Sequence, residues 1–115
     1  MQNIERLRLY LNKKSYYEQD DYEQFLEENG LDPYTEYDVA NDKKAMLQTV
    51  YDVLDCLAND IDNFRRVETE FVTTSAAEQY LEKRLKSIKA DIDKLEDLEK
   101  QDGNDSVTGY FFYNS

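Results

Sequence analysis

Apolar residues recur three or four positions apart in the first third of the chain, which is the spacing of one face of a helix. Ile4, Leu7 and Leu11 follow this spacing. They predict a short amphipathic helix over residues 2–12, and Arg6 and Arg8, which flank the apolar positions, are expected to face solvent.

A second short helix is predicted over residues 20–29. Gly30 stands where a left-handed C-cap would end it. Pro33 prevents a helix from forming directly afterwards, because the residue before a proline is pushed out of the helical region. Residues 31–38 are therefore expected to form a loop.

The broadest apolar stripe predicts a central helix over residues 39–64. It covers roughly 160° of the helix when each residue advances by 100°. A helix with one neighbour needs a narrower stripe, so we expect at least two elements to pack on this one. Cys56 lies opposite the stripe and is expected to face solvent or a second contact. The stripe consists of Met46, Leu47, Val50, Tyr51, Val53, Leu54, Leu57, Ala58 and Ile61.

An extended connector is predicted after the central helix. β-Branched and charged residues alternate over residues 67–73, which is the pattern of a short strand. Ser75 and Glu78 then have the spacing of a capping box, which predicts the start of a last helix.

The last helix carries an uninterrupted heptad seam. The seam is too short for an independent coiled coil, so we expect it to pack against the central helix. Homodimerisation through the seam is the alternative. The seam residues are Leu81, Leu85, Ile88, Ile92 and Leu95.

Four consecutive aromatic residues follow Gly103 and Gly109. Each aromatic side chain can bury ~150–250 Å², so this segment is expected to dock on its own domain or on another chain. Residues 107–113 are also strand-prone, and they could pair with residues 67–73 of the same chain or of a neighbour. The aromatic residues are Tyr110, Phe111, Phe112 and Tyr113.

These patterns together predict an all-α fold. We expect a small four-helix bundle-like domain with two long helices, a short extended connector and an extended C-terminal arm. The length of 115 residues fits one domain. The helical domain is expected to span residues 1–100, and a flexible or docking arm residues 101–115.

Acidic residues dominate the charge, and the formal net charge is −12. Residues 15–42 hold ten Asp and Glu residues and no Lys or Arg. Binding of bare duplex DNA by the whole protein is not expected, because it needs Lys and Arg to replace phosphate counterions. An acidic surface could instead face a basic protein, or line a pore through which DNA passes.

Composition also bears on location. No apolar run approaches the roughly 18 residues that cross a bilayer. The single cysteine gives no sign of an oxidising compartment. The expected location is the cytosol, including a viral assembly made there, with no membrane contact.

Residue types that carry catalysis are scarce. The chain has no His, one Cys and three scattered Gly, which excludes His-containing triads, Cys-rich metal sites and phosphate loops. The acidic residues at 102–105 lack the register of a calcium loop, and the pair Asp60 and Asp62 is interpreted as solvated. We therefore expect no catalytic residue, no cofactor, no metal and no enzymatic activity. An enzyme that holds Mg²⁺ or Ca²⁺ by carboxylates alone is the residual alternative.

The ten tyrosines favour interaction surfaces, because Tyr offers a large contact area at low rotamer entropy. We expect some of them to fill the margins of the core. The expected interface residues are Tyr16, Tyr17, Tyr34, Tyr37, Phe71, Val107, Tyr110, Phe111, Phe112 and Tyr113.

The order of these patterns over residues 1–98 resembles the small head–tail connector (neck adaptor) proteins of tailed bacteriophages. The resemblance rests on a short helix, an acidic tyrosine-containing helix, a long helix, a Val/Thr-rich connector and a second long helix. It does not extend past Gly103. The residues that carry it are Ile4, Leu7 and Leu11, then Tyr22, Phe25 and Leu26, then Leu47, Val50, Leu54, Leu57 and Ile61.

The resemblance implies a structural virion protein of the phage neck. Such subunits form a ring, usually dodecameric, that joins the capsid portal to the next neck or tail protein. DNA passes through the channel of the ring without specific binding. The resemblance implies no catalytic residue, and assembly in the host cytoplasm.

A different class of function also fits the charge. A small acidic protein without catalytic residues could mimic DNA and inhibit a host nuclease, as anti-restriction or anti-CRISPR proteins do. This alternative accounts for residues 15–42 but not for the aromatic segment.

Overall fold

The computed structural model describes residues 1–107 of the chain, with side chains described for residues 1–100. Every element in this part is a helix, so the predicted all-α class is confirmed, with five helices in place of four. The helices are α1 (Asn3–Tyr10), α2 (Gln19–Glu28), α3 (Val39–Asn59), α4 (Ile61–Glu68) and α5 (Thr74–Val107).

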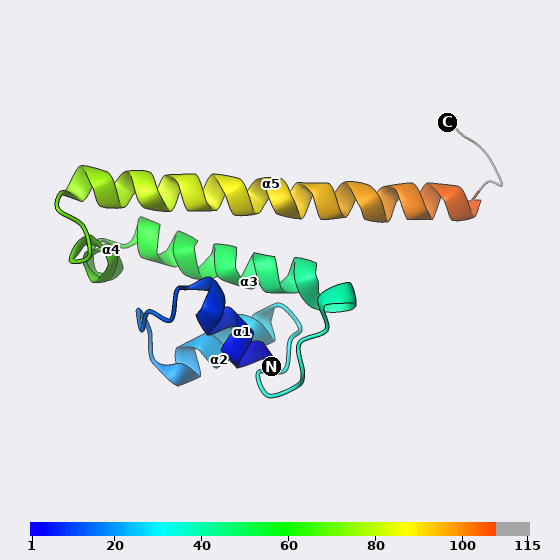
Figure 1. Ribbon diagram of the computed structural model, residues 1–115, viewed down its shortest axis with the longest axis horizontal. Coiled ribbons are helices and arrows are strands. Elements are labelled where there is room, and N and C mark those ends of the chain that lie inside the picture. Colours follow the sequence, from blue (N-terminus) through cyan, green and yellow to red (C-terminus); the bar gives the residue numbers. More distant parts are fainter. Residues whose placement is uncertain (108–115) are drawn as a thin grey trace.

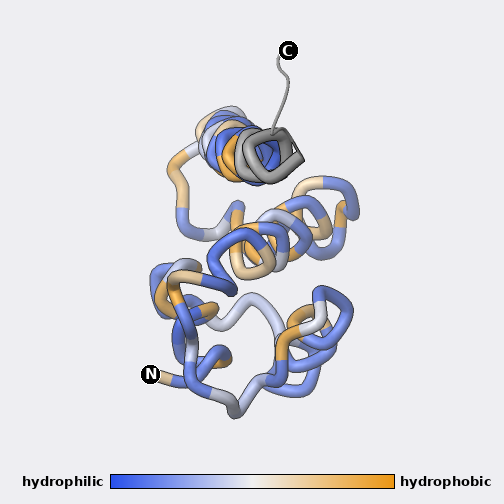
Figure 2. Tube along the Cα trace, turned by 90° about the vertical axis from the view of Figure 1, so that its right-hand side faces the viewer, coloured by the Kyte–Doolittle hydropathy of each residue, from blue (hydrophilic) through white to orange (hydrophobic). Residues whose placement is uncertain are grey.

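The helices are stacked in layers around α3. Helix α5 runs along one side of α3, and α1 and α2 lie on the opposite side (Figure 1). The view along the layers shows the same order (Figure 2). Because α3 contacts all four other helices, the prediction that several elements pack on the central helix is confirmed.

The core lies along α3. Val50, Val53 and Leu57 have no exposed surface, and Leu54 has 1%. Full burial of such an aliphatic side chain contributes roughly 1.5–3 kcal/mol. Further buried residues come from every other helix, namely Ile4, Leu7, Leu11, Tyr22, Leu26, Val67, Leu81, Ile88 and Ile92.

The two short helices and the loop after them match the predicted ranges. Gly30 adopts a φ of 77° after α2, and the amide of Leu31 donates to the carbonyl of Leu26 at 3.0 Å, which closes the helix end. The loop over residues 31–38 is held against the start of α1, where the amide of Ile4 donates to the carbonyl of Pro33 at 2.9 Å.

The expectation that Arg6 and Arg8 face solvent is wrong, because both are half-buried. Arg6 lies over the ring of Tyr10, and Arg8 lies over the ring of Tyr22.

The predicted central helix over residues 39–64 is wrong in its length. The chain leaves the helical conformation at Asp60, whose φ is −124° and ψ is 126°, and it resumes as α4. The carboxylate of Asp60 accepts the amides of Asp62 at 2.9 Å and Asn63 at 3.0 Å. A capped start of this kind favours a new helix over continuation of the old one.

The predicted strand over residues 67–73 is also wrong. Val67 and Glu68 end α4, with Val67 fully buried, and the following residues form a turn. The alternation of apolar and charged residues here reflects one buried helical position, not a strand.

Helix α5 begins earlier and runs further than predicted. Thr73, not Ser75, provides the cap, since its hydroxyl accepts the amide of Ala76 at 3.0 Å. The helix continues through Gly103 to Val107, across the boundary expected at residue 100. The predicted strand pairing and docking of the segment that follows lie outside the described residues.

Candidate interaction surface

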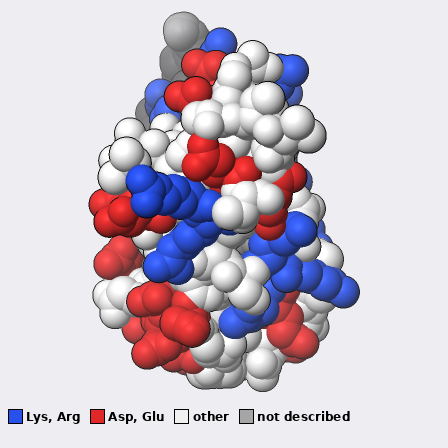
Figure 3. All heavy atoms as spheres, turned by 90° about the vertical axis from the view of Figure 1, so that its left-hand side faces the viewer, with Lys and Arg blue, Asp and Glu red and all other residues white. Residues whose placement is uncertain are grey.

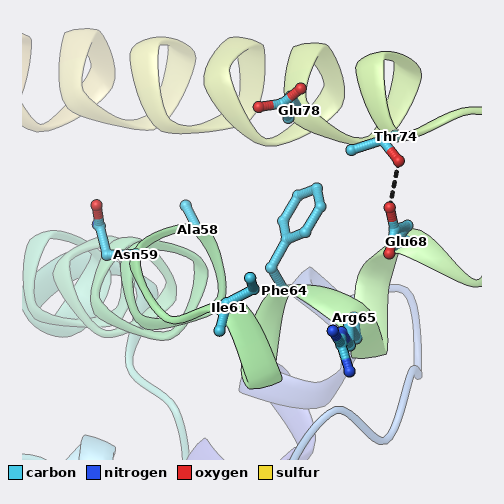
Figure 4. Close-up of a pocket in the computed structure, with 8 residues that line it drawn as sticks. All are labelled: Ala58, Asn59, Ile61, Phe64, Arg65, Glu68, Thr74 and Glu78. Atoms are coloured by element: carbon cyan, nitrogen blue, oxygen red, sulfur yellow. Dashed lines mark hydrogen bonds between the residues drawn. The ribbon is translucent and has the colours of Figure 1, made fainter.

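A groove lies where α4 meets the end of α3 and the start of α5 (Figure 4). We call it the α4 groove. Its main cavity has a volume of about 470 Å³, within the range of roughly 300–1,000 Å³ typical of binding pockets. The cavity is lined by Ala58, Asn59, Ile61, Phe64, Arg65, Glu68, Thr74 and Glu78.

The groove exists because α4 leaves the axis of α3. The extended backbone at Asp60 turns the chain, and the Asp60 cap fixes the first turn of α4. Arg65 and Arg66 occupy the last turn, where positive charge is favourable at the negative end of the helix dipole. This local sequence therefore positions the side chains that form the groove.

Apolar side chains from α3 and α4 form the base of the groove. Phe64 is half-buried, and its ring projects from α4 toward α5, between Ala58 and Glu78 (Figure 4). Ile61 is 73% exposed. A large β-branched apolar side chain so open to water at the mouth of a cavity is a candidate contact for a partner.

The groove continues along α5. A second cavity of about 300 Å³ shares Ala58, Phe64 and Glu78 with the first, and it adds Leu81 and Leu85. Asp55 and Glu82 also line it. The α4 groove is thus an elongated apolar depression with an acidic rim.

The rim is fixed by contacts between α4 and α5. The hydroxyl of Thr74 donates a hydrogen bond to the carboxylate of Glu68 (Figure 4). Arg65 supplies the positive charge in the lining of the main cavity. The carboxylate acceptors on this rim suit a ligand that brings hydroxyl or amide donors.

The opposite side of α4 is anchored to the loop before α2. The hydroxyl of Tyr16 donates to the carboxylate of Glu70 at 2.9 Å, and the guanidinium of Arg66 donates to the carbonyl of Tyr16. Arg66 also lies over the ring of Tyr17, 5.2 Å from its centroid. Burial and the Glu70 carboxylate raise the pKa of Tyr16, so its hydroxyl stays protonated as a donor.

A separate depression of about 380 Å³, outside the α4 groove, is lined in part by Cys56. The Cys56 thiol is exposed, and its pKa is raised by partial burial and by the carboxylates of Asp55 and Asp52. The other residues that line the depression are Tyr17, Asp21, Gln24, Phe25, Glu28, Asn63 and Arg66. The prediction that Cys56 faces away from the apolar stripe of α3 agrees with this position.

The structure gives the expected interface tyrosines different environments. Tyr16 is 5% exposed and belongs to the core of its own chain, so it offers little surface to a partner. Tyr17 and Tyr37 are half-buried against the core, and Tyr34 is 53% exposed. Tyr16 and Tyr17 lie together beside Arg66, while Tyr34 and Tyr37 follow α2 at the other end of the short helices.

Phe71 packs within the protein, with its ring 5.2 Å from that of Tyr80. Val107 ends α5, and its side chain is outside the described part, as are Tyr110, Phe111, Phe112 and Tyr113. Sequence reasoning missed Ile61 and Phe64 as surface residues, because it placed Ile61 on the buried stripe of α3. The available signal was Asp60, a strong N-cap residue followed by Asp62 in the first turn.

Carboxylates are numerous on the described surface of the protein. Among the residues that the structure describes, no group of three or more His, Cys, Asp or Glu side chains could hold a metal ion. Asp60 acts as a helix cap. On the face at the α4 end of the molecule, Lys and Arg side chains lie among Asp and Glu side chains (Figure 3).

Comparison of the chain with protein-family models, with curated proteins and with solved structures gives no match. None of the helices in the described part of the chain combines the length and apolar character needed to cross a membrane.

Proposed function

We propose that this protein is a structural component of a phage neck, forming a ring that joins the capsid portal to the tail and continues the DNA channel. The observation that carries the proposal is the shape of the subunit. A layered helical body bears a 34-residue helix that runs the length of the body and leads into an aromatic segment. A body of this kind with an apolar arm suits repeated subunit contacts.

The surface features support an assembly role. The α4 groove has an apolar base and an exposed Ile61, and the charges on the α4 end are mixed in sign. Interfaces between proteins combine an apolar centre with a polar rim in this way. The portal and the next neck or tail protein are the expected partners, with the ring expected to be dodecameric.

Mass spectrometry of purified virions tests this function directly. A neck component stays with particles through density-gradient purification, in a constant ratio to the portal protein. A tagged copy expressed during infection should also recover the portal or a tail protein. Absence of the chain from purified virions would overturn the proposal.

One observation favours the acidic DNA mimic as a second candidate. Asp20, Asp21 and Glu27 are exposed on α2, and most of the carboxylates of residues 15–42 face solvent. Such a surface would bind a basic nuclease tightly at low salt and weakly at high salt, because exposed charges are screened. Recovery of a host nuclease by the tagged chain, lost at high salt, would place this candidate first.

A further inference from the structure

We propose that the aromatic residues 110–113 of one copy of this chain bind in the α4 groove of a second copy. The contact rests on the proposed function, since it would be the joint between neighbouring subunits of the ring.

The chemistry of the segment suits the groove. Residues 108–115 carry no charged side chain, so no charged side chain of the segment would have to be removed from water. Phe111 and Phe112 would contact Phe64 at the apolar base and Ile61 at the mouth of the groove. The tyrosine hydroxyls can donate to the carboxylates of the rim, such as Glu78, which accept hydrogen bonds only.

The segment cannot reach the groove of its own chain. Along α5, the rise of 1.5 Å per residue places Val107 about 33 Å from Leu85, the groove residue nearest to that end of the helix. A fully extended chain advances at most 3.6 Å per residue, so Tyr113 lies no more than about 22 Å from Val107. The part of the groove beside Glu78, which lies about 44 Å from Val107 along α5, is further still. Residues 110–113 can therefore reach that part only on another molecule.

The aromatic segment offers enough surface for a subunit contact. Full burial of four aromatic side chains would remove at most roughly 600–1,000 Å² of the segment from water, against about 800 Å² per partner in a standard interface. The contact joins different surfaces of the two copies. Such head-to-tail contacts generate a closed ring when the rotation between subunits closes.

Disulfide trapping in the full chain tests the contact. All variants carry C56S, so that only introduced thiols react. A chain with Glu78→Cys is mixed with a larger, tagged chain carrying Phe112→Cys and oxidised mildly. A covalent heterodimer is expected. Glu27→Cys, on the exposed face of α2, is the matched control and should give at least about tenfold less heterodimer.

A single chain that carries both Glu78→Cys and Phe112→Cys separates the two geometries. Intermolecular docking gives a ladder of covalent dimers and higher species. An internally closed monomer as the main product would overturn the proposal, as would equal trapping at Glu27→Cys.

A second set of variants changes an apolar residue of the groove and keeps the introduced cysteine at Glu78 as the reporter. Ile61→Asp in the receiving chain should lower trapping at a cysteine on the rim about tenfold, the effect of losing one apolar contact at an interface centre. Val72→Asp is the control, because Val72 is fully exposed and lies outside the groove lining. Both side chains are exposed, and circular dichroism should show that both variants fold. Equal trapping in the two variants would contradict the proposal.

The outcomes distinguish this contact from the neck function. A chain that is incorporated into virions but shows no specific trapping retains the function and loses the contact. A chain that is trapped as expected but is absent from virions forms the contact in an assembly of another kind, and the neck function is then wrong.

Discussion

The hydroxyl of Tyr16 donates a hydrogen bond of 2.9 Å to the carboxylate of Glu70, although the two residues are 54 positions apart. The bond joins the loop before α2 to the turn between α4 and α5. Arg66 adds a bond to the Tyr16 carbonyl, so α4 is held on the side opposite to the α4 groove. The position of the groove therefore depends on contacts with the N-terminal helices.

Removal of the Tyr16 hydroxyl should destabilise the protein. Tyr16→Phe keeps the buried ring and loses the bond to Glu70, so we expect the free energy of unfolding to fall by about 1–2 kcal/mol. Tyr34→Phe is the matched control for a solvent-exposed bond of the same kind, because the Tyr34 hydroxyl donates to the carboxylate of Glu23 and the residue is 53% exposed. Its effect should stay within about 0.5 kcal/mol, since exposed polar pairs contribute little. Urea denaturation measures both. A loss of less than about 0.5 kcal/mol for Tyr16→Phe would show that the Tyr16–Glu70 bond does not stabilise the fold.

Loss of the Asp60 cap should weaken α4. Asp60→Ala leaves the amides of Asp62 and Asn63 without their acceptor, and we expect a loss of about 1 kcal/mol in the free energy of unfolding. Asp60→Asn should restore most of it, since Asn caps helices about as well as Asp. Thermal unfolding followed by circular dichroism makes the comparison. If Asp60→Asn lowered the free energy of unfolding as much as Asp60→Ala, the carboxylate would stabilise α4 through its charge and not as a hydrogen-bonding cap.

Periodicity predicted the all-α class, both short helices and the seam of α5, because those elements bury one face each. It failed at Asp60 because Ile61 has the spacing of the α3 stripe, and the break depends on two hydrogen bonds of one carboxylate. Spacing also could not separate Tyr16 from Tyr34. Tyr16 is held by hydrogen bonds with Glu70 and Arg66, which lie far from it in the sequence.

The α4 groove could not be predicted for the same reason. It forms between three helices whose relative placement depends on tertiary contacts, such as the bond between Thr74 and Glu68. The sequence did indicate an aromatic segment in need of a partner surface. The surface proposed to receive it depends on the helix break at Asp60, which turns α4 away from the axis of α3. Spacing alone did not predict that break.

The seam of α5 should behave as core and not as a dimer contact. Ile92 is 2% exposed, and Ile92→Ala should lower the free energy of unfolding by about 2–4 kcal/mol. Leu98, on the same helix, is 56% exposed, and Leu98→Ala should cost less than about 0.5 kcal/mol. Urea denaturation at two protein concentrations checks this. A midpoint for Ile92→Ala that depends on protein concentration would favour dimerisation through the seam.

Alkaline pH should destabilise the fold through its buried tyrosines. Burial raises the pKa of Tyr17 to about 12, and it also raises the pKa of Tyr22 and of Tyr37. An unfolded tyrosine loses its proton near pH ~10, so above that pH the unfolded state binds fewer protons than the folded state. The contribution of these protonated tyrosines to the free energy of unfolding is complete below about pH 10, and it is lost as the pH rises toward 12.

Urea denaturation from pH 9 to 11.5 should show this decline, and the tyrosinate absorbance of the folded protein should rise in two stages. Tyr17→Phe should make the decline less steep. A free energy of unfolding that stays constant across this range would contradict the raised pKa values.

The Cys56 thiol should react slowly for an exposed cysteine. Partial burial and the carboxylates of Asp55, Asp52 and Glu28 raise its pKa, so less of the nucleophilic thiolate is present at pH 8 than in the unfolded chain. Reaction with a chromogenic disulfide reagent should therefore be slower in the folded protein than in urea. It should accelerate with rising pH and with added salt, because salt screens the carboxylates.

Asp55→Asn separates the two causes of slow reaction at Cys56. Removal of that charge should increase the thiolate fraction and the reaction rate, whereas Asp91→Asn, an exposed substitution on α5, should leave the rate unchanged. An Asp55→Asn rate equal to that of the parent protein would show that the Asp55 charge does not slow the reaction, and would leave burial, the largest expected cause, together with the charges of Asp52 and Glu28. A folded protein that reacts as fast as the urea-unfolded chain would contradict the raised pKa itself.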